Sequence, residues 1–421
     1  MKRLVWVLVW ALALAILPVT VPAEAASWRF TDVTSSTSLA ATQETWTANA
    51  VDYNADGRQD ILIGYHDNGG KLWRNNGNGT MSWVAQDAWP VRWPTPTGEW
   101  KRADRHGGDW ADVDLDGRID AYYTVGRTGS NRVKDGATDN ELWLQRSPGA
   151  FTDVATQLGV GDPYGRGRSA VFLDANTDGR PDLYVVNEVP RSGDVEGQAS
   201  GTNKLFMNVA DPASPYGFRF ARAPSWGIDR HFGFGQTVLS LDYDGDRRED
   251  LLLSGRSRLF LFRNTGSSFL DVSTTCAVPG GHVEAAAAAD IDHDGRTDLV
   301  EVRKTSVAWQ RNLGTTFAPA RKIRALTYGY EVAVGDADGD GLDDVYVQQA
   351  ATSSNPPDFV FLNRRTSWIS VQAPSMAGRA SDVEALALRG AGRPVDFVVL
   401  NGGGGLRGPV KVLRLTLTTT A

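Results

Sequence analysis

Cysteine is almost absent from this chain, because Cys276 is the single one among 421 residues. A lone cysteine excludes an intrachain disulfide. A buried, inert thiol is its ordinary interpretation, and an intermolecular bridge is the alternative. The stability that disulfides give many exported proteins must therefore come from other sources, first of all from a hydrophobic core.

Long apolar segments are missing after the N-terminus. Two basic residues precede an apolar run from Leu4 to Leu17, and Ala23-Glu24-Ala25 matches a signal-peptidase cleavage site. The run is shorter than the roughly 20 residues that a membrane-spanning helix needs. We expect residues 1–26 to be a secretory signal peptide and residues 27–421 to form one exported domain without a membrane span.

Recognisable catalytic motifs are missing too. The sequence has no G-x-S-x-G nucleophile elbow, no histidine pair at zinc-binding spacing and no G-x-x-x-x-G-K-[ST] phosphate loop. Paired carboxylates for glycoside hydrolysis cannot be singled out, because most Asp residues fall in one repeated motif. These absences favour a binding protein over an enzyme without excluding an enzyme.

The chain does contain a nine-residue loop, Asp112-Val-Asp114-Leu-Asp116-Gly117-Arg-Ile-Asp120, that recurs in phase. Side chains at positions 1, 3 and 5 of a tight turn converge on one point, and Gly at position 6 permits the sharp bend. Hard cations such as Ca²⁺ prefer six to eight oxygen ligands of this kind. The loop therefore predicts a calcium site.

Six copies of the loop are present. One Asp-rich turn could merely satisfy its own backbone, but six copies in register argue against that explanation. We number the copies loop one to loop six. The predicted cation ligands are Asp52, Asn54, Asp56 and Asp60; Asp112, Asp114, Asp116 and Asp120; Asp174, Asn176, Asp178 and Asp182; Asp242, Asp244, Asp246 and Asp250; Asp290, Asp292, Asp294 and Asp298; Asp336, Asp338, Asp340 and Asp344. Loop four has Arg247 in place of Gly at position 6, and we expect the weakest site there.

The residues after each loop show to which class of calcium-binding structure the loops belong. An EF-hand needs flanking helices and an acidic residue at position 12. In this chain every position 9 Asp leads directly into an apolar β-type segment, such as Ile61-Leu-Ile63 or Leu251-Leu-Leu253. Position 12 is acidic in one copy only, at Glu301. The loops therefore join two strands, which excludes an EF-hand.

The repeat predicts an all-β fold, a seven-bladed β-propeller of four-stranded blades. A strand of small residues precedes each loop, the apolar segment follows it, and two further strands carry larger residues. A degenerate seventh copy keeps only Asp396 of the loop and the strand after it. The segment Trp28–Val33 matches the fourth-strand pattern, so we expect the N-terminal strand to complete the last blade and remove an open edge.

The D-x-[DN]-x-D-G-x-x-D loop between strands, with elements such as Leu72-Trp-Arg-Asn-Asn-Gly-Asn-Gly-Thr80 and Phe151-Thr-Asp-Val154, resembles the FG-GAP/VCBS repeat family. Its best-known members are the integrin α-subunit propellers. The FG signature itself occurs in His231-Phe-Gly-Phe-Gly235. The resemblance covers nearly all of residues 27–421. It implies a calcium-stabilised extracellular propeller with about six structural Ca²⁺ sites, and it implies no single activity.

In the family the metal loops occupy one face of the propeller, so the extra length of this chain falls on the other. The insertions are residues 85–108, 126–140, 156–169, 187–203 and 222–236. We expect them to form the binding surface. Together they hold 12 Lys/Arg against 10 Asp/Glu, which does not favour nucleic acid as a partner.

Repeat phase also singles out the residue six positions before each loop, which we expect at the mouth of the central channel. These residues are Trp46, His106, Arg168, Gln236, Glu284, Tyr330 and Asp382. Six further candidates from the insertions are Trp93, Trp100, Arg105, Arg166, Arg230 and His231. Aromatic faces beside Arg suit sugar rings or peptides. Alternatively, the Trp side chains only pack the long loops, and a channel mouth is polar because it is wet.

The predicted function is that of a secreted, monomeric binding or adhesion module for a glycan or a cell-envelope protein, acting through its upper-face loops. The alternative is a carbohydrate-active enzyme, a polysaccharide lyase or hydrolase, with its site at the channel mouth. Such an enzyme would use Arg168, His106, His231 or Tyr330 as neutraliser and base.

Overall fold

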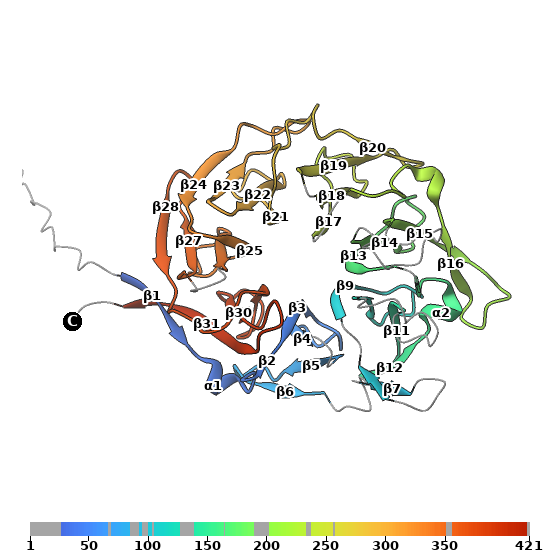
Figure 1. Cartoon of the computed structure of the whole chain (residues 1–421), viewed down its shortest axis with the longest axis horizontal. Helices are drawn as coiled ribbons and strands as arrows, with labels where there is room; N and C mark the ends of the chain where they lie inside the picture. The colour runs from blue at the N-terminus through green and yellow to red at the C-terminus, as the bar shows by residue number, and fades with distance from the viewer. Residues whose placement is uncertain are drawn as a thin grey trace, which may run out of the picture.

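Seven antiparallel sheets stand around a central axis, so the expected all-β, seven-bladed propeller is confirmed (Figure 1). The computed structural model describes residues 27–65, 69–84, 92–94, 100–102, 105–126, 139–163, 165–188, 202–232, 237–255, 257–350 and 356–418. Of residues 92–94 and 100–102 it describes the backbone. The expected signal peptide lies outside the described residues.

Each blade has four strands, which follow one another from the axis outwards. Blade one is β3 (Thr45–Val51), β4 (Asp60–Tyr65), β5 (Gly69–Asn75) and β6 (Met81–Trp83). Blade two is β9 (Arg105–Ala111), β10 (Asp120–Val125), β11 (Glu141–Ser147) and β12 (Ala150–Asp153). Blade three is β13 (Gly167–Leu173), β14 (Asp182–Asn187), β15 (Lys204–Ala210) and β16 (Phe218–Arg222). Blade four is β17 (Val238–Leu241), β18 (Asp250–Ser254), β19 (Leu259–Asn264) and β20 (Phe269–Asp271).

Blade five is β21 (Ala285–Ala289), β22 (Asp298–Arg303), β23 (Ser306–Gln310) and β24 (Arg321–Ala325). Blade six is β25 (Gly329–Gly335), β26 (Asp344–Gln349), β27 (Phe359–Asn363) and β28 (Trp368–Gln372). Blade seven is β29 (Asp382–Leu386), β30 (Asp396–Leu400), β31 (Gly408–Thr418) and β1 (Ser27–Asp32). The minor elements are α1 (Thr34–Thr37), β2 (Thr42–Gln43), the pair β7 (Arg92–Pro94) and β8 (Trp100–Arg102), α2 (Ala155–Leu158) and the 3₁₀ turn η2 (Pro224–Trp226).

The two ends of the chain close the ring. Strand β1 pairs antiparallel with β31, with Phe30 opposite Leu415, and so supplies the fourth strand of blade seven as expected (Figure 1). Strand β2 also pairs with β31, where Thr42 lies opposite Pro409. Because the first and last parts of the chain share one sheet, the ring has no open edge between blades seven and one.

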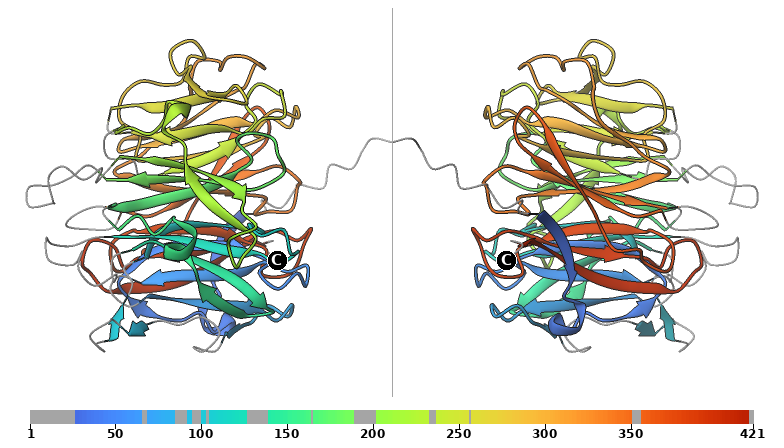
Figure 2. Two further views of the ribbon diagram at one scale, coloured as in Figure 1. Left: turned by 90° about the vertical axis from the view of Figure 1, so that its right-hand side faces the viewer. Right: turned by 90° about the vertical axis from the view of Figure 1, so that its left-hand side faces the viewer.

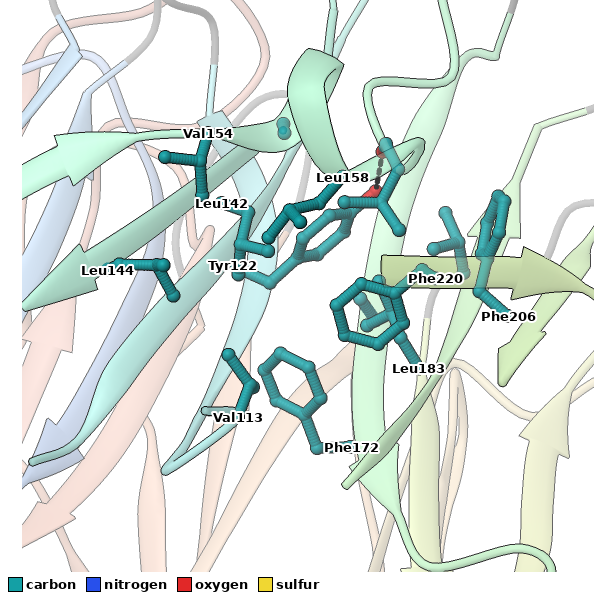
Figure 3. Packing of buried hydrophobic residues seen from close by; sticks show 14 of the residues in the cluster. Val113, Tyr122, Leu142, Leu144, Val154, Leu158, Phe172, Leu183, Phe206 and Phe220 are labelled. Carbon is teal, nitrogen blue, oxygen red and sulfur yellow. Dashed lines mark hydrogen bonds between the residues drawn. The ribbon is translucent and has the colours of Figure 1, made fainter. Parts of the chain in front are cut away.

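The buried apolar side chains gather between neighbouring blades. Seven clusters are found among the described residues, one at each blade–blade junction. At the junction of blades two and three, Tyr122 packs against Phe172 and Phe220, and its hydroxyl donates to the carbonyl of Val160 at 2.8 Å (Figure 3). Cys276 is a buried free thiol in the cluster between blades four and five. The larger residues of the second and third strands thus fill the wedges between blades.

Because neighbouring strands of a blade are antiparallel, the connections between strands lie on two opposite faces of the propeller (Figure 2). Connections from first to second and from third to fourth strand leave one end of a blade, and the remaining connections leave the other end. The six loops are first-to-second connections, so they share the face that we call the lower face. The described residues of the five insertions belong to connections on the opposite, upper face. Residues 85–91, 95–99, 103–104, 127–138, 164, 189–201 and 233–236 within them lie outside the described residues.

Candidate functional site

The six loops of the lower face share one backbone conformation. In loop two the Asp112 carboxylate accepts from the backbone N–H groups of Asp116 at 2.9 Å and Gly117 at 2.8 Å. In all six loops the backbone N–H of the residue at position 6 donates a hydrogen bond to the carboxylate at position 1. The same turn is therefore built six times, with its carboxylates already held in place.

Position 6 requires a left-handed backbone, as the glycines indicated. Gly117 has φ +85°, and Arg247 of loop four adopts φ +65° and donates its N–H to Asp242 at 2.8 Å, as glycine does elsewhere. A non-glycine residue in this conformation costs about 1–2 kcal/mol. Loop four nevertheless closes like the others, and its rank as the weakest site stays a prediction.

Oxygen ligands converge inside the loops. In four loops, three carboxylates each offer one oxygen, and the three oxygens lie within 4.8 Å of one another; the groups are Asp112, Asp114 and Asp120; Asp242, Asp244 and Asp246; Asp290, Asp292 and Asp294; Asp336, Asp338 and Asp344. Loops one and three have an amide at position 3 instead, in Asn54 and Asn176. Oδ1 of Asp114 and Oδ1 of Asp292 are buried and have no hydrogen-bond partner among the described residues. An all-oxygen set with unsatisfied inward oxygens fits a hard cation such as Ca²⁺.

Position 9 has a structural role beyond the ligand role expected for it. The buried Asp120 accepts from the backbone N–H of Val113 at 3.0 Å and from that of Gln145 at 2.8 Å. It thereby fastens its own loop to the third strand. Burial, followed by repulsion from Asp114 and Asp116, raises the pKa of Asp120 to about 7. An oxygen of Asp120 also belongs to the convergent group, so this carboxylate can serve both purposes.

Buried amides at the end of the third strands link each loop to the neighbouring blade. Asn264 donates to the carbonyl of Glu249 in its own loop at 3.1 Å and to that of Ala175 in loop three at 2.9 Å. The equivalent residues, which we call the inter-blade amides, are Asn75, Gln145, Asn208, Asn264, Asn312 and Asn363. Sequence reasoning missed them, although the motif with Asn after the third strand was visible.

The degenerate seventh loop replaces the cation ligands by a guanidinium. Arg414 of β31 holds both oxygens of the buried Asp396, at 2.8 and 2.9 Å. Arg389 lies 3.7 Å from the same carboxylate. A charged residue of the chain thus neutralises the one carboxylate that this copy retains.

The upper ends of the innermost strands carry most of the predicted rim. Trp46, His106, Arg168 and Tyr330 are each the extra residue at a register shift between the first and second strands. A β-bulge turns its extra side chain out of the regular alternation. Trp46, His106, Arg168 and Asp382 line the axial channel, as expected for a ring at its mouth.

Three of these rim residues contact one another across blades one to three. The Trp46 and His106 rings stack with centroids 4.6 Å apart, and Nη1 of Arg168 lies 2.6 Å from Nδ1 of His106. Arg168 also forms an ion pair with Glu188. A guanidinium can only donate, so Nδ1 of His106 accepts and the ring proton sits on Nε2. We call Trp46, His106 and Arg168 the rim triad.

Below the rim the channel is acidic. It has a volume of about 710 Å³, and Asp109, Glu331, Asp382 and Glu384 line it among small apolar residues. Burial raises the pKa of Asp382 to about 7, and burial with repulsion from Asp382 raises that of Glu384 to about 8. Oδ2 of Asp382 accepts from the backbone N–H of Ala48 at 2.7 Å, which joins blade seven to blade one.

Two predicted ligand contacts lie inside the protein. Arg105 is fully buried, with Nε 2.7 Å from Glu141, and the buried Arg166 lies 3.5 Å from Glu188. Ion pairs within the fold neutralise both guanidinium charges, and the spacing of residues in the sequence does not reveal these pairs. We therefore remove both residues from the candidate binding surface.

The remaining candidates are spread over the upper face. Arg230 and His231 are exposed in the connection from blade three to blade four. Glu284 lies 3.3 Å from His282 and 3.8 Å from Lys304. The side chains of Trp93 and Trp100, and all of Gln236, lie outside the described residues. The triad and the channel acids therefore form the best-defined part of the predicted site.

Comparisons with known proteins agree with the repeat. A family model described as FG-GAP-like repeat matches residues 52–123, 112–185 and 242–301. Cartilage acidic protein 1 of Homo sapiens is 26% identical over 201 residues, covering 44% of this chain and 28% of the human protein. The Xenopus tropicalis protein of that name is 24% identical over 200 residues, covering 44% of this chain and 29% of the relative. The chain thus spans less than a third of the length of these relatives.

A solved structure concerned with recognition of non-reducing terminal N-acetylglucosamine by an Agrocybe aegerita lectin has a TM-score of 0.48. It is 16% identical to this chain, and the alignment covers 79% of this chain and 80% of the lectin chain. Within the described part of the chain, no helix has the length and apolar character to cross a bilayer.

Fold and loops together define a β-propeller of the binding type, built from repeats with an Asp-rich loop on one face. The chain carries FG-GAP-like repeats and is homologous to cartilage acidic protein 1.

Proposed function

We propose that this protein is a secreted, calcium-stabilised propeller that binds a carbohydrate through its upper face, at the mouth of the axial channel. The observation that carries the proposal is the rim triad, in which three neighbouring blades bring an indole, an imidazole and a guanidinium together beside a polar channel. Aromatic faces next to polar donors suit sugar rings, whose C–H faces stack while their hydroxyls accept and donate.

The lower face would hold the cations. Ca²⁺ bound in the loops would take the inward oxygens at positions 1, 3 and 5 and offset the repulsion among them. The chain's own contribution is the prearranged turn, in which backbone N–H groups hold the position 1 carboxylate. The homologue named for cartilage supports an extracellular setting.

An enzyme at the channel mouth is the second candidate, and His106 does not favour it. Its Nδ1 is occupied by Arg168, so this histidine offers no free lone pair to a substrate proton. Asp382 and Glu384 are two channel carboxylates whose raised pKa values suit them to act as acids in such an enzyme.

A glycan-array screen of the mature protein, with and without Ca²⁺, tests the binding proposal. We expect calcium-dependent binding of a glycan that Trp46→Ala abolishes. Trp83→Ala is the matched control, because Trp83 is 47% exposed on the outermost strand of blade one, away from the channel. A blank array would contradict carbohydrate binding and leave a cell-envelope protein as the ligand. Turnover of a bound polysaccharide would instead support the enzyme.

A further inference from the structure

In each loop that has Asp at position 3, an arginine from the same blade forms an ion pair with that Asp. Nε of Arg311 lies 2.5 Å from Oδ2 of Asp292, and Nη2 of the same side chain lies 2.7 Å from Oδ2 of Asp294. The corresponding pairs in loops two, four and six are Arg146 with Asp114, Arg263 with Asp244, and Arg364 with Asp338. Each arginine lies next to an inter-blade amide at the end of the third strand.

The two loops with Asn at position 3 have no such partner within the part of the chain that the structure describes. In blade three the neighbours of Asn208 are Met207 and Val209. In blade one Arg74 precedes Asn75 just as Arg311 precedes Asn312, yet no ion pair joins Arg74 to loop one among the described residues. The arginine contact therefore follows the extra negative charge at position 3.

The contact leaves the inward oxygen available. In loops two and five the arginine contacts Oδ2 of the position 3 Asp, while Oδ1 is buried and has no hydrogen-bond partner in the described part of the chain. In loop three the outward atom of Asn176 is an amide nitrogen, which itself donates to Asp178 at 3.1 Å. One arginine thus offsets the charge that Asp adds relative to Asn, from outside the ligand set.

We propose that Arg146, Arg263, Arg311 and Arg364 are built-in counter-ions that set the cation affinity of the loops with Asp at position 3. This inference rests on the proposed calcium binding. A guanidinium held against one or two of the ligand carboxylates repels an arriving dication and stabilises the empty loop. Its removal should therefore tighten cation binding and destabilise the empty protein.

The opposite change in cation affinity would follow if the main role of the arginine were to orient the carboxylate. Partners that orient a metal ligand increase affinity, and their loss weakens binding. For an ion pair as exposed as this one, with Arg311 41% accessible, ordering the carboxylate adds little. The repulsion between the guanidinium and the cation is then the larger effect.

Hydrogen exchange of the peptide that contains loop five, measured across free Ca²⁺ concentrations, tests the inference at one site. We expect Arg311→Gln to lower the half-saturating Ca²⁺ concentration of loop five about fivefold. The other five loops serve as internal controls. Arg311→Lys keeps the charge and should remain close to the native value, whereas Arg74→Gln should not shift loop one.

A second measurement covers the empty state. In excess EGTA, Arg311→Gln should melt about 1–2 °C below the native protein, and Arg74→Gln should not. An unchanged or higher half-saturating concentration in Arg311→Gln would overturn the inference, and a higher one would make Arg311 a positioning residue. If native loops gain no protection from Ca²⁺, the proposed calcium binding fails and the inference with it. If native loops respond and Arg311→Gln matches them, the inference alone fails.

Discussion

The side-chain amide of Asn264 in blade four donates to the backbone carbonyl of Ala175 in loop three, at 2.9 Å. Asn264 is fully buried, and its Oδ1 accepts from the backbone N–H of Gly266 at 2.8 Å. The amide therefore connects a loop of one blade to the hairpin of the next. Because inter-blade amides recur around the ring, loop geometry on the lower face is coupled to blade packing.

Replacing Asn264 should destabilise the propeller. Asn264→Ala leaves the buried carbonyl of Ala175 without its donor, which costs about 1–3 kcal/mol in the free energy of unfolding. Urea denaturation in saturating Ca²⁺ measures the change. Asn78→Ala is the control, because Asn78 is exposed in a hairpin turn and its side chain accepts hydrogen bonds only from Thr80 among the described residues. Equal effects of the two substitutions would contradict the role assigned to Asn264.

The channel acids should make stability fall as pH rises. The pKa of Glu384 is raised to about 8 in the folded state, above its ordinary value of 4.5, so the folded protein binds the proton more tightly than the unfolded chain. The resulting stability is fully present below about pH 4.5 and is lost as pH rises towards 8. Glu284, Tyr330, Glu331, Arg379 and Asp382 are the charged and titratable groups around this acidic part of the channel.

Glu384→Gln removes that titration. At pH 8.5 and saturating Ca²⁺ we expect the variant to be about 1–2 kcal/mol more stable than the native protein, and at pH 5 nearly equal to it. Urea midpoints at the two pH values give the comparison. A variant that is less stable than the native protein at pH 8.5 would show that the carboxylate stabilises the seam between blades seven and one.

Arg247→Gly should strengthen loop four. The substitution removes the cost of a left-handed non-glycine residue and one positive charge near the ligands. Because loop four is already closed without a cation, relief of this strain should stabilise the empty and the loaded protein alike, by about 1–2 kcal/mol. Loss of the positive charge acts on binding itself, and we expect it to lower the half-saturating Ca²⁺ concentration of this loop by up to about fivefold. Hydrogen exchange of the peptide spanning residues 238–254 measures it, with loop five as the reference. An unchanged half-saturating concentration would mean that the charge of Arg247 does not act on the cation site.

Much of the fold was predictable because the repeat signals are local. Acidic or amide residues at positions 1, 3 and 5, followed in most copies by Gly at position 6, predict the turn, and the apolar segment after Asp120 predicts the strand that follows. Six such copies predict a ring of similar blades. The N-terminal strand could be assigned because Phe30 lies in a segment that matches the fourth strands elsewhere. These features depend on neighbours within a few residues.

The site was less predictable because it depends on distant partners. Arg105 looked like a surface residue, yet its partner Glu141 lies 36 residues further along the chain. The bulge at His106 arises from pairing with β10, and its stack on Trp46 comes from another blade. Sequence reasoning did not single out Asn264, because only the tertiary structure places Ala175 beside it.

The most direct test of the account is the thermal unfolding of residues 27–421 in excess EGTA and in millimolar Ca²⁺. In loop two alone, Asp112, Asp114 and Asp120 bring their oxygens within 4.8 Å of one another, and such groups recur around the ring. We predict a melting temperature at least about 10 °C higher with Ca²⁺ and a dependence on Ca²⁺ concentration, as expected for a ligand that binds only the folded state. Identical melting curves in Ca²⁺ and EGTA would contradict the central claim that the loops are structural cation sites.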